Sequence, residues 1–170
     1  MALYGCQLVE IIDPRGADRK KLIVWVEIDR CMTDAISSVT GVRIGKRSLK
    51  YVDFGKVAAT FFNLETTQGV RLLALESARE LADNRYPHFN DKKSRQMAAY
   101  ENASVEELFK VQRVSVNLTE FDLPGRPRSR VTCERCGEAV NDKREVVSTA
   151  GSFLCKGCFS GTYYEVSTVY

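Results

Sequence analysis

The chain has 170 residues, of which 44% are hydrophobic, and its 25 basic and 22 acidic side chains give a net charge of +3. This length allows one sizeable core and a smaller module. No apolar stretch approaches the roughly 20 residues of a membrane span, and so small a charge gives little attraction to nucleic-acid phosphates. We therefore expect a soluble two-domain protein that contacts no membrane, and we do not expect nucleic acid as its partner.

Hydrophobic periodicity and turn residues predict a first module of mixed helices and strands over residues 1–122. In chain order we expect a helix at 2–12, a strand at 22–26, a helix at 34–39, strands at 49–53, 57–63 and 70–74, helices at 76–83 and 92–102, a helix opening with a capping box at 104–107, and a strand at 111–118. The strand at 22–26 reads Leu-Ile-Val-Trp-Val, which is typical of a central strand. The fold class is therefore α+β, with a mixed or antiparallel sheet and flanking helices.

Residues 123–130 read Leu-Pro-Gly-Arg-Pro-Arg-Ser-Arg, which predicts an extended linker between two modules. Its arginines, Arg126, Arg128 and Arg130, either belong to a solvated linker or form a binding patch, and the linker is the simpler interpretation. From residue 130 onward five basic residues balance five acidic ones. Nucleic-acid-binding fingers are usually basic, so this balance argues against that role.

Four cysteines dominate the last quarter of the chain and stand as C-x2-C-x18-C-x2-C: Cys133, Cys136, Cys155 and Cys158. This spacing is typical of a zinc ribbon, which we place at residues 131–170, with one Zn²⁺ per chain. Four thiolates fill the coordination sphere, so the site is expected to be structural, and metal removal should unfold the module. Arg135 and Lys156 are placed to offset its negative charge.

Two disulfides are the alternative use of these cysteines. Disulfides belong to oxidising compartments, and the chain opens without the apolar core of a secretory leader. We therefore expect a cytoplasmic protein whose thiols stay free to bind metal.

The middle of the first module carries a dense run of motifs: Glu-x-Asp-x-Cys-x-x-Asp-Ala from Glu27, Thr-Gly-x-x-x-Gly-Lys from Thr40, and Asp-Phe-Gly-Lys-x-Ala from Asp53. Together with the two C-x2-C pairs, these motifs resemble the FmdE family, which takes its name from formylmethanofuran dehydrogenase. The resemblance covers nearly the whole chain. It implies an α+β domain followed by a zinc ribbon, often dimeric, in anaerobic archaea and bacteria, and encoded near a molybdenum or tungsten formylmethanofuran dehydrogenase.

Members of that family also carry a His-x-Cys-Pro segment, whose His and Cys are thought to join a central Cys at a metal or active site. This chain opens at Met1-Ala2-Leu3-Tyr4-Gly5, apparently inside the helix that follows that segment. We expect either that the start has been trimmed or that this member has lost the site.

Cys31 follows the end of a predicted strand, close in sequence to Glu27, Asp29 and Asp34. These residues make a candidate pocket in which Cys31 serves as a second metal ligand or a nucleophile, with Lys46 and Lys56 supplying the cation that a thiolate among carboxylates needs. The alternative is that Cys31 is a small buried hydrophobe and the aspartates cap a helix.

Three functions remain open. The first, which we favour, is a zinc-binding accessory or regulatory protein that docks onto a partner, such as an oxidoreductase complex of one-carbon metabolism, and forms a homodimer. The second is a metal-dependent enzyme or metal-handling protein using Cys31 and its acidic neighbours. The third is a ribbon that binds nucleic acid. Three other features are weaker candidates: Cys6 as a core residue, His88 in a surface loop, and Tyr163 and Tyr164 as interface aromatics.

Overall fold

The computed structural model describes residues 1–167, with the side chain of Arg79 excepted. The chain divides into two compact units, Met1–Asn117 and Leu118–Tyr170. Residues 168–170 of the predicted ribbon lie outside the described part. The predicted linker at 123–130 and the domain limits around it remain predictions.

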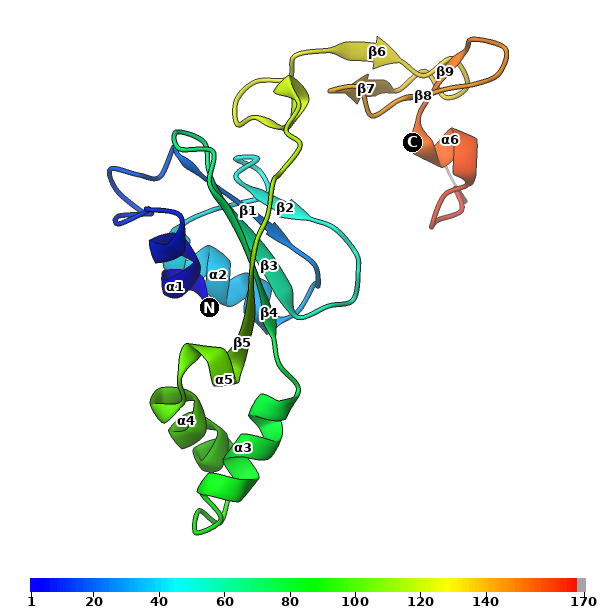
Figure 1. Ribbon diagram of the computed structural model, residues 1–170. Helices are drawn as coiled ribbons and strands as arrows, with labels where there is room; N and C mark the ends of the chain where they lie inside the picture. The colour runs from blue at the N-terminus through cyan, green and yellow to red at the C-terminus, as the bar shows by residue number, and fades with distance from the viewer. Residues whose placement is uncertain (168–170) are drawn as a thin grey trace. The chain divides into compact units, whose positions relative to one another are not determined.

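A five-stranded mixed sheet forms the centre of the first unit, in the order β2-β1-β3-β4-β5 (Figure 1). Its strands are β1 (Leu22–Val26), β2 (Leu49–Tyr51), β3 (Ala58–Asn63), β4 (Gly69–Ala74) and β5 (Phe109–Arg113). Strands β1 and β2 are parallel, and the other neighbours in this sheet are antiparallel. The α+β class with a mixed sheet and helices, expected from the sequence, is confirmed.

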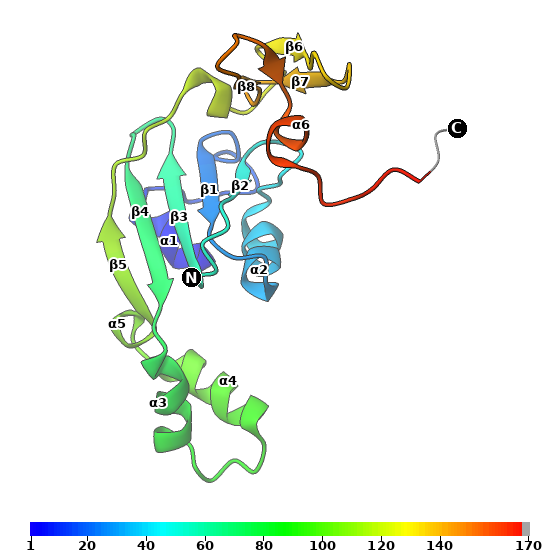
Figure 2. The same cartoon turned by 90° about the vertical axis from the view of Figure 1, so that its right-hand side faces the viewer.

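Two helices, α1 (Ala2–Leu8) and α2 (Cys31–Thr40), cover one face of this sheet (Figure 2). The strand pairing places alternate residues on that face, where they meet the helices in one core: Cys6, Val9, Ile11, Leu22, Val24, Val26, Ile36, Val42, Leu49, Ala59, Phe61, Val70 and Leu72. Gly5 of α1 lies against the ring of Phe61, and a Cβ added at Gly5 would stand 2.4 Å from it. Glycine is therefore required for α1 to pack this close.

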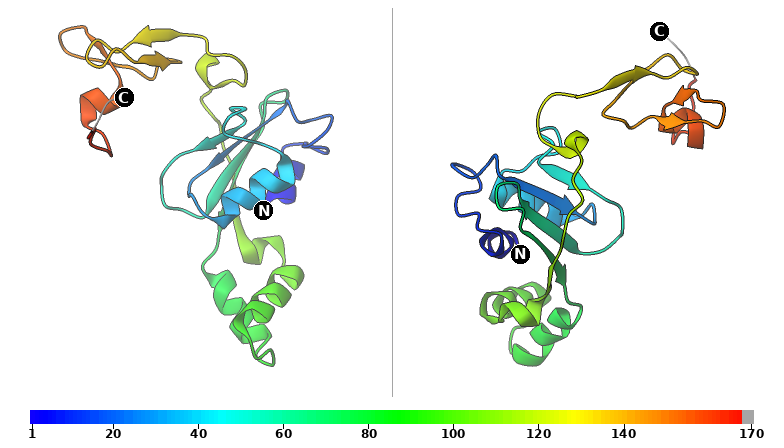
Figure 3. Two further views of the ribbon diagram at one scale, coloured as in Figure 1. Left: turned by 180° about the vertical axis from the view of Figure 1, so that it is seen from behind. Right: turned by 45° about the horizontal axis from the view of Figure 1, so that its top comes forward.

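Three further helices continue the first unit: α3 (Ser77–Arg85), α4 (Lys92–Asn102) and α5 (Val105–Leu108). The α3–α4 pair lies beyond one end of the sheet (Figure 3). The capping box predicted at 104–107 is present, with the Ser104 N–H donating to Glu107 at 2.9 Å.

Some helix and strand ends differ from those predicted. The first helix ends at Leu8, four residues early, because Glu10 takes a left-handed backbone and Val9, Ile11 and Ile12 are β-branched. The second helix starts a turn earlier, at Cys31, and ends as expected before Gly41, whose φ is 75°. The last strand of the sheet, β5, starts at Phe109 and ends at Arg113, where 111–118 was predicted.

The second unit has short elements: η1 (Glu120–Asp122), β6 (Arg130–Thr132), β7 (Ala139–Asn141), β8 (Val146–Val147), β9 (Phe153–Leu154) and α6 (Lys156–Ser160). The strands pair as two antiparallel hairpins, β6–β7 and β8–β9. Arginines of the predicted linker have partners within this unit, since Arg128 lies 3.5 Å from Glu120 and the Arg130 Nε donates to Asn141 at 3.0 Å.

Candidate metal centre

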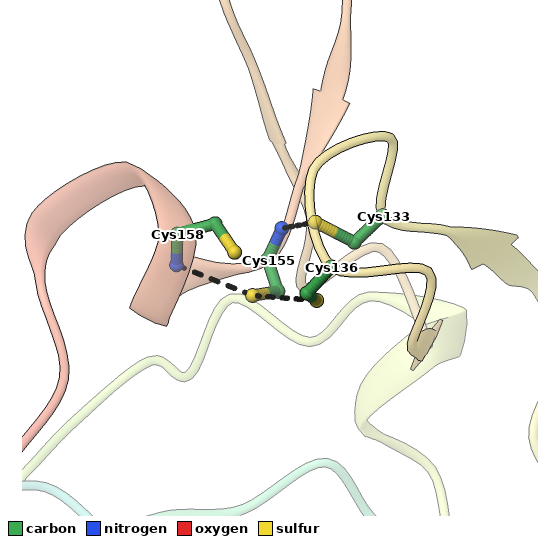
Figure 4. A group of neighbouring side chains, drawn as sticks. All are labelled: Cys133, Cys136, Cys155 and Cys158. Atoms are coloured by element: carbon green, nitrogen blue, oxygen red, sulfur yellow. Dashed lines mark hydrogen bonds between the residues drawn. The ribbon is translucent and has the colours of Figure 1, made fainter. Parts of the chain in front are cut away.

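The four cysteine sulfurs of the second unit converge (Figure 4). All four Sγ atoms lie within 4.8 Å of one another, and those of Cys136 and Cys155 are 3.9 Å apart. Within residues 1–167, this is the one group of three or more His, Cys, Asp or Glu side chains arranged to hold a metal ion. The four residues that the spacing indicated are therefore brought together.

Each cysteine pair follows the end of a strand and sits on a tight turn. After β6, the Gly137 N–H donates to the Cys133 carbonyl at 2.9 Å, and Gly137 has a φ of 74°, a conformation that favours glycine. After β9, Cys155 caps α6, and its Sγ accepts the Cys158 N–H at 3.3 Å. Both turns thus direct two sulfurs to a common centre.

Hydrogen bonds join the two turns to each other. The Cys155 N–H donates to the Cys133 Sγ at 3.2 Å, and the Arg135 guanidinium donates to the Cys158 carbonyl at 2.8 Å. The Glu134 carboxylate accepts the Phe153 N–H at 2.9 Å. The sequence placed Arg135 near the metal for its charge, but it did not reveal this bond across the site.

The same contacts divide the proton affinities of the thiols. Hydrogen bonding from the Cys155 backbone N–H lowers the pKa of Cys133 to about 6. Its neighbour Cys155 raises the pKa of Cys158 to about 12. One sulfur thus ionises readily while crowding holds protons on another, and a bound dication would release both protons.

The sulfur spacing fits a tetrahedral metal. With metal–sulfur bonds of about 2.3 Å, a tetrahedron has sulfur–sulfur edges of roughly 3.8 Å. The 3.9 Å between Cys136 and Cys155 is close to that edge. Four thiolates leave no position for an activated water, so such a centre can organise the fold but cannot activate a water nucleophile.

The candidate pocket around Cys31 is less complete. Cys31 is the first residue of α2 and is exposed, which contradicts the alternative that it is buried. Asp29 and Asp34 are also exposed, and the described residues hold no metal-binding group that includes them. Burial and an Asp53 hydrogen bond raise the pKa of Tyr51, to which Asp29 also contributes, so acidic groups gather around this ring.

The two lysines expected beside Cys31 are both exposed. The Lys56 ammonium lies 5.6 Å from the centre of the Phe54 ring, as a cation–π contact. A pairing of either lysine with Cys31 therefore stays a prediction.

Glu27 does not belong to that pocket. Both of its carboxylate oxygens accept from Arg71, at 2.6 and 2.7 Å, and Arg71 also donates to Gln112 at 2.7 Å. Glu27 is buried, and a buried carboxylate needs such a partner. Sequence reasoning missed Arg71 because it lies 44 residues away and becomes a neighbour through strand pairing.

The weaker candidates lie where they were expected. Cys6 is buried in the core, and burial raises the pKa of its thiol to about 11. His88 is exposed in the loop between α3 and α4, 4.6 Å from the Phe89 ring. Tyr163 and Tyr164 are exposed and stack edge to face at 5.1 Å. None of these residues joins the cysteine cluster.

The helices of the described residues are also short or polar. In that part of the chain, none has both the length and the apolar character needed to cross a bilayer.

Known proteins resemble the chain in both sequence and fold. A probable S-adenosyl-L-methionine-binding protein of Archaeoglobus fulgidus is 29% identical over 172 residues, which cover 91% of this chain and 44% of that protein. The chain therefore spans less than half the length of this curated relative. A crystal structure of an FmdE-like protein of tungsten formylmethanofuran dehydrogenase, from Syntrophus aciditrophicus, has a TM-score of 0.55 at 20% identity. The match covers 96% of this chain and 85% of that one, and it shows a shared fold.

The sequence model of one family, described as FmdE, Molybdenum formylmethanofuran dehydrogenase operon, matches residues 1–117. The match ends at the residue where the first compact unit ends. It covers more than half of the chain and agrees with the resemblance seen in the motifs. The chain belongs to the FmdE family.

Proposed function

We propose that the protein is a zinc-binding accessory protein that docks onto a partner, an oxidoreductase complex of anaerobic one-carbon metabolism. The observation that carries this proposal is the closed four-sulfur cluster. It holds together a unit with little buried apolar surface and provides no open coordination position for chemistry. Family membership supplies the class of partner, because the family is described by the formylmethanofuran dehydrogenase operon.

Zinc is the metal we assign to the cluster. Zn²⁺ accepts four thiolates in tetrahedral geometry, and the sulfur spacing suits it. All six cysteines are free in the structure, as expected in a reducing cytoplasm, where we place the protein.

The second unit also exposes apolar side chains that suit docking. Val147 of β8 and Phe153 of β9 are paired across the hairpin, and 58% and 41% of their surfaces are exposed. Phe159 of α6 is 55% exposed. Exposed aromatic residues are common at the centres of protein interfaces.

A homodimer is part of the same proposal. Helix α2 presents Ala35 and Val39 to solvent one turn apart, and Leu3 of α1 is also exposed. Size-exclusion chromatography with light scattering would give the mass directly. A mass of one chain at all concentrations would contradict the dimer without touching the zinc assignment.

The test of docking uses purified molybdenum or tungsten formylmethanofuran dehydrogenase. Native mass spectrometry should detect a complex with this chain. The double variant Val147→Ser and Phe153→Ser should lose the complex while keeping one zinc per chain. A matched control is Ile12→Ser in the first unit, where the side chain is 90% exposed. Failure of the unaltered chain to bind would contradict the proposal.

The alternative is an enzyme or metal-handling protein centred on Cys31. Its exposed thiol at the start of α2, with acidic groups near Tyr51, favours this possibility. Elemental analysis of protein purified without oxygen distinguishes the two functions. A second metal per chain that disappears in Cys31→Ala, while the ribbon zinc stays, would support the alternative.

A further inference from the structure

A cavity of about 460 Å³, open to solvent, lies at one end of β4 and β5 in the first unit. Its lining residues come from the turn before β4 and from the end of β5: Thr67, Gln68, Gly69, Arg113, Val114 and Ser115. Neither the cysteine cluster nor Cys31 contributes to it. Its volume lies in the range of small-ligand sites.

Arg113 is the one charged side chain of this lining, and its position is fixed. Its Nη1 donates to the Leu8 carbonyl at the end of α1 at 2.9 Å and to the Gln68 side-chain oxygen at 3.3 Å. The Gln68 amide nitrogen in turn donates to the Glu10 carboxylate at 3.1 Å. Gln68 thus lies between the positive and the negative group and orients the guanidinium.

This anchoring uses only one nitrogen of the guanidinium. Within the described residues, the Arg113 Nε and Nη2 have no hydrogen-bond partner, and the Thr67 and Ser115 hydroxyls have none either. A planar guanidinium with two free donor nitrogens matches the oxygens of a carboxylate or a phosphate, and the hydroxyls add further donors. A residue that served only to cap α1 would need no cavity beside it.

We propose that this cavity binds the carboxylate or phosphate group of a small molecule, with Arg113 as the principal contact and the Thr67 and Ser115 hydroxyls as secondary donors. The Glu10 carboxylate repels such a group, and Gln68 stands between them. Binding is therefore expected to be weak for the isolated anions and strongly dependent on ionic strength.

Two-dimensional amide NMR of the full chain, loaded with zinc, tests the proposal. Sodium phosphate and sodium acetate are titrated separately, each against sodium chloride at matched ionic strength. We expect saturable shifts confined to residues 67–69 and 113–115. Saturation with phosphate alone assigns a phosphate ligand, and saturation with acetate alone assigns a carboxylate.

Variants separate specific binding from general attraction. Arg113→Gln should weaken binding about tenfold or more, because it removes a charge-assisted contact. Lys110→Gln is the matched control, since it removes the same charge from an exposed position on β5 outside the cavity. Ser115→Asp leaves Arg113 and its anchors in place but should also abolish binding by adding a negative charge at the cavity.

Three results would overturn the proposal: shifts that never saturate, shifts that chloride reproduces, or affinity that survives in both Arg113→Gln and Ser115→Asp. Dispersed spectra outside the cavity verify that each variant is folded. Because the cavity is separate from the ribbon, these results are independent of docking and zinc binding.

Discussion

The two units of this chain are stabilised by different physical forces. The first surrounds a mixed sheet with a continuous core, and every buried hydrophobic residue of the described chain except Cys133 belongs to it. The second has strands of two or three residues, and the one such residue it buries is a cysteine of the cluster. Apolar burial thus accounts for the first fold, while the second needs a metal to compensate for a small core.

Metal removal is the largest expected effect and acts on one unit alone. A chelator should unfold the second unit, since structural zinc contributes roughly 10 kcal/mol or more in ribbon peptides. The first unit should keep its fold. Amide NMR with zinc analysis reports both units at once, and Cys136→Ala should reproduce the result without chelator. Retention of ribbon signals in metal-free protein would show that its fold is independent of metal.

Truncation of the core is the converse perturbation. Phe61→Ala removes the ring at the centre of the first unit, fully buried against Gly5, and should lower the free energy of unfolding by about 3–5 kcal/mol. Chemical denaturation followed by Trp25 fluorescence measures this loss. Zinc content should not change. Phe159→Ala, on a half-exposed ring of the second unit, is the control with little expected loss.

Breaking the buried ion pair tests a second contribution to the first unit. Glu27→Gln leaves the Arg71 charge without its partner on the sheet, and the free energy of unfolding should fall by about 3 kcal/mol. The same denaturation assay measures it. Glu107→Gln, which removes the exposed partner of Arg85, should cost less than about 1 kcal/mol. Equal losses for the two variants would mean that burial adds nothing to the Glu27 pair.

The smallest effect is expected at Cys31. Cys31→Ala replaces an exposed residue at the first position of α2, so stability should change by about 0.5 kcal/mol or less. Thermal unfolding is the measurement. Cys6→Ser, in the buried core, is the contrasting variant and should destabilise clearly. A large loss at Cys31 would reveal a structural contact there.

Sequence reasoning succeeded where the signal is local. The spacing of Cys133, Cys136, Cys155 and Cys158 indicated their convergence, and Gly41 marked the end of α2 correctly. It failed where distant residues meet. The partner of Glu27 depends on the register of β1, β3 and β4, and the cavity at Arg113 depends on how β5 runs past the end of α1. Such contacts are set by pairing across the sheet and have no period along the chain.

The close approach of Gly5 to Phe61 also bears on the order in which the chain folds. Helix α1 has seven residues, far fewer than an isolated helix needs for stability in water. Its contacts in the core come from strands that follow it by many residues in the sequence. We therefore expect a segment that leaves the ribosome before these strands to be among the last to become ordered, since it has no surface to fold on until the β3–β4 hairpin has formed.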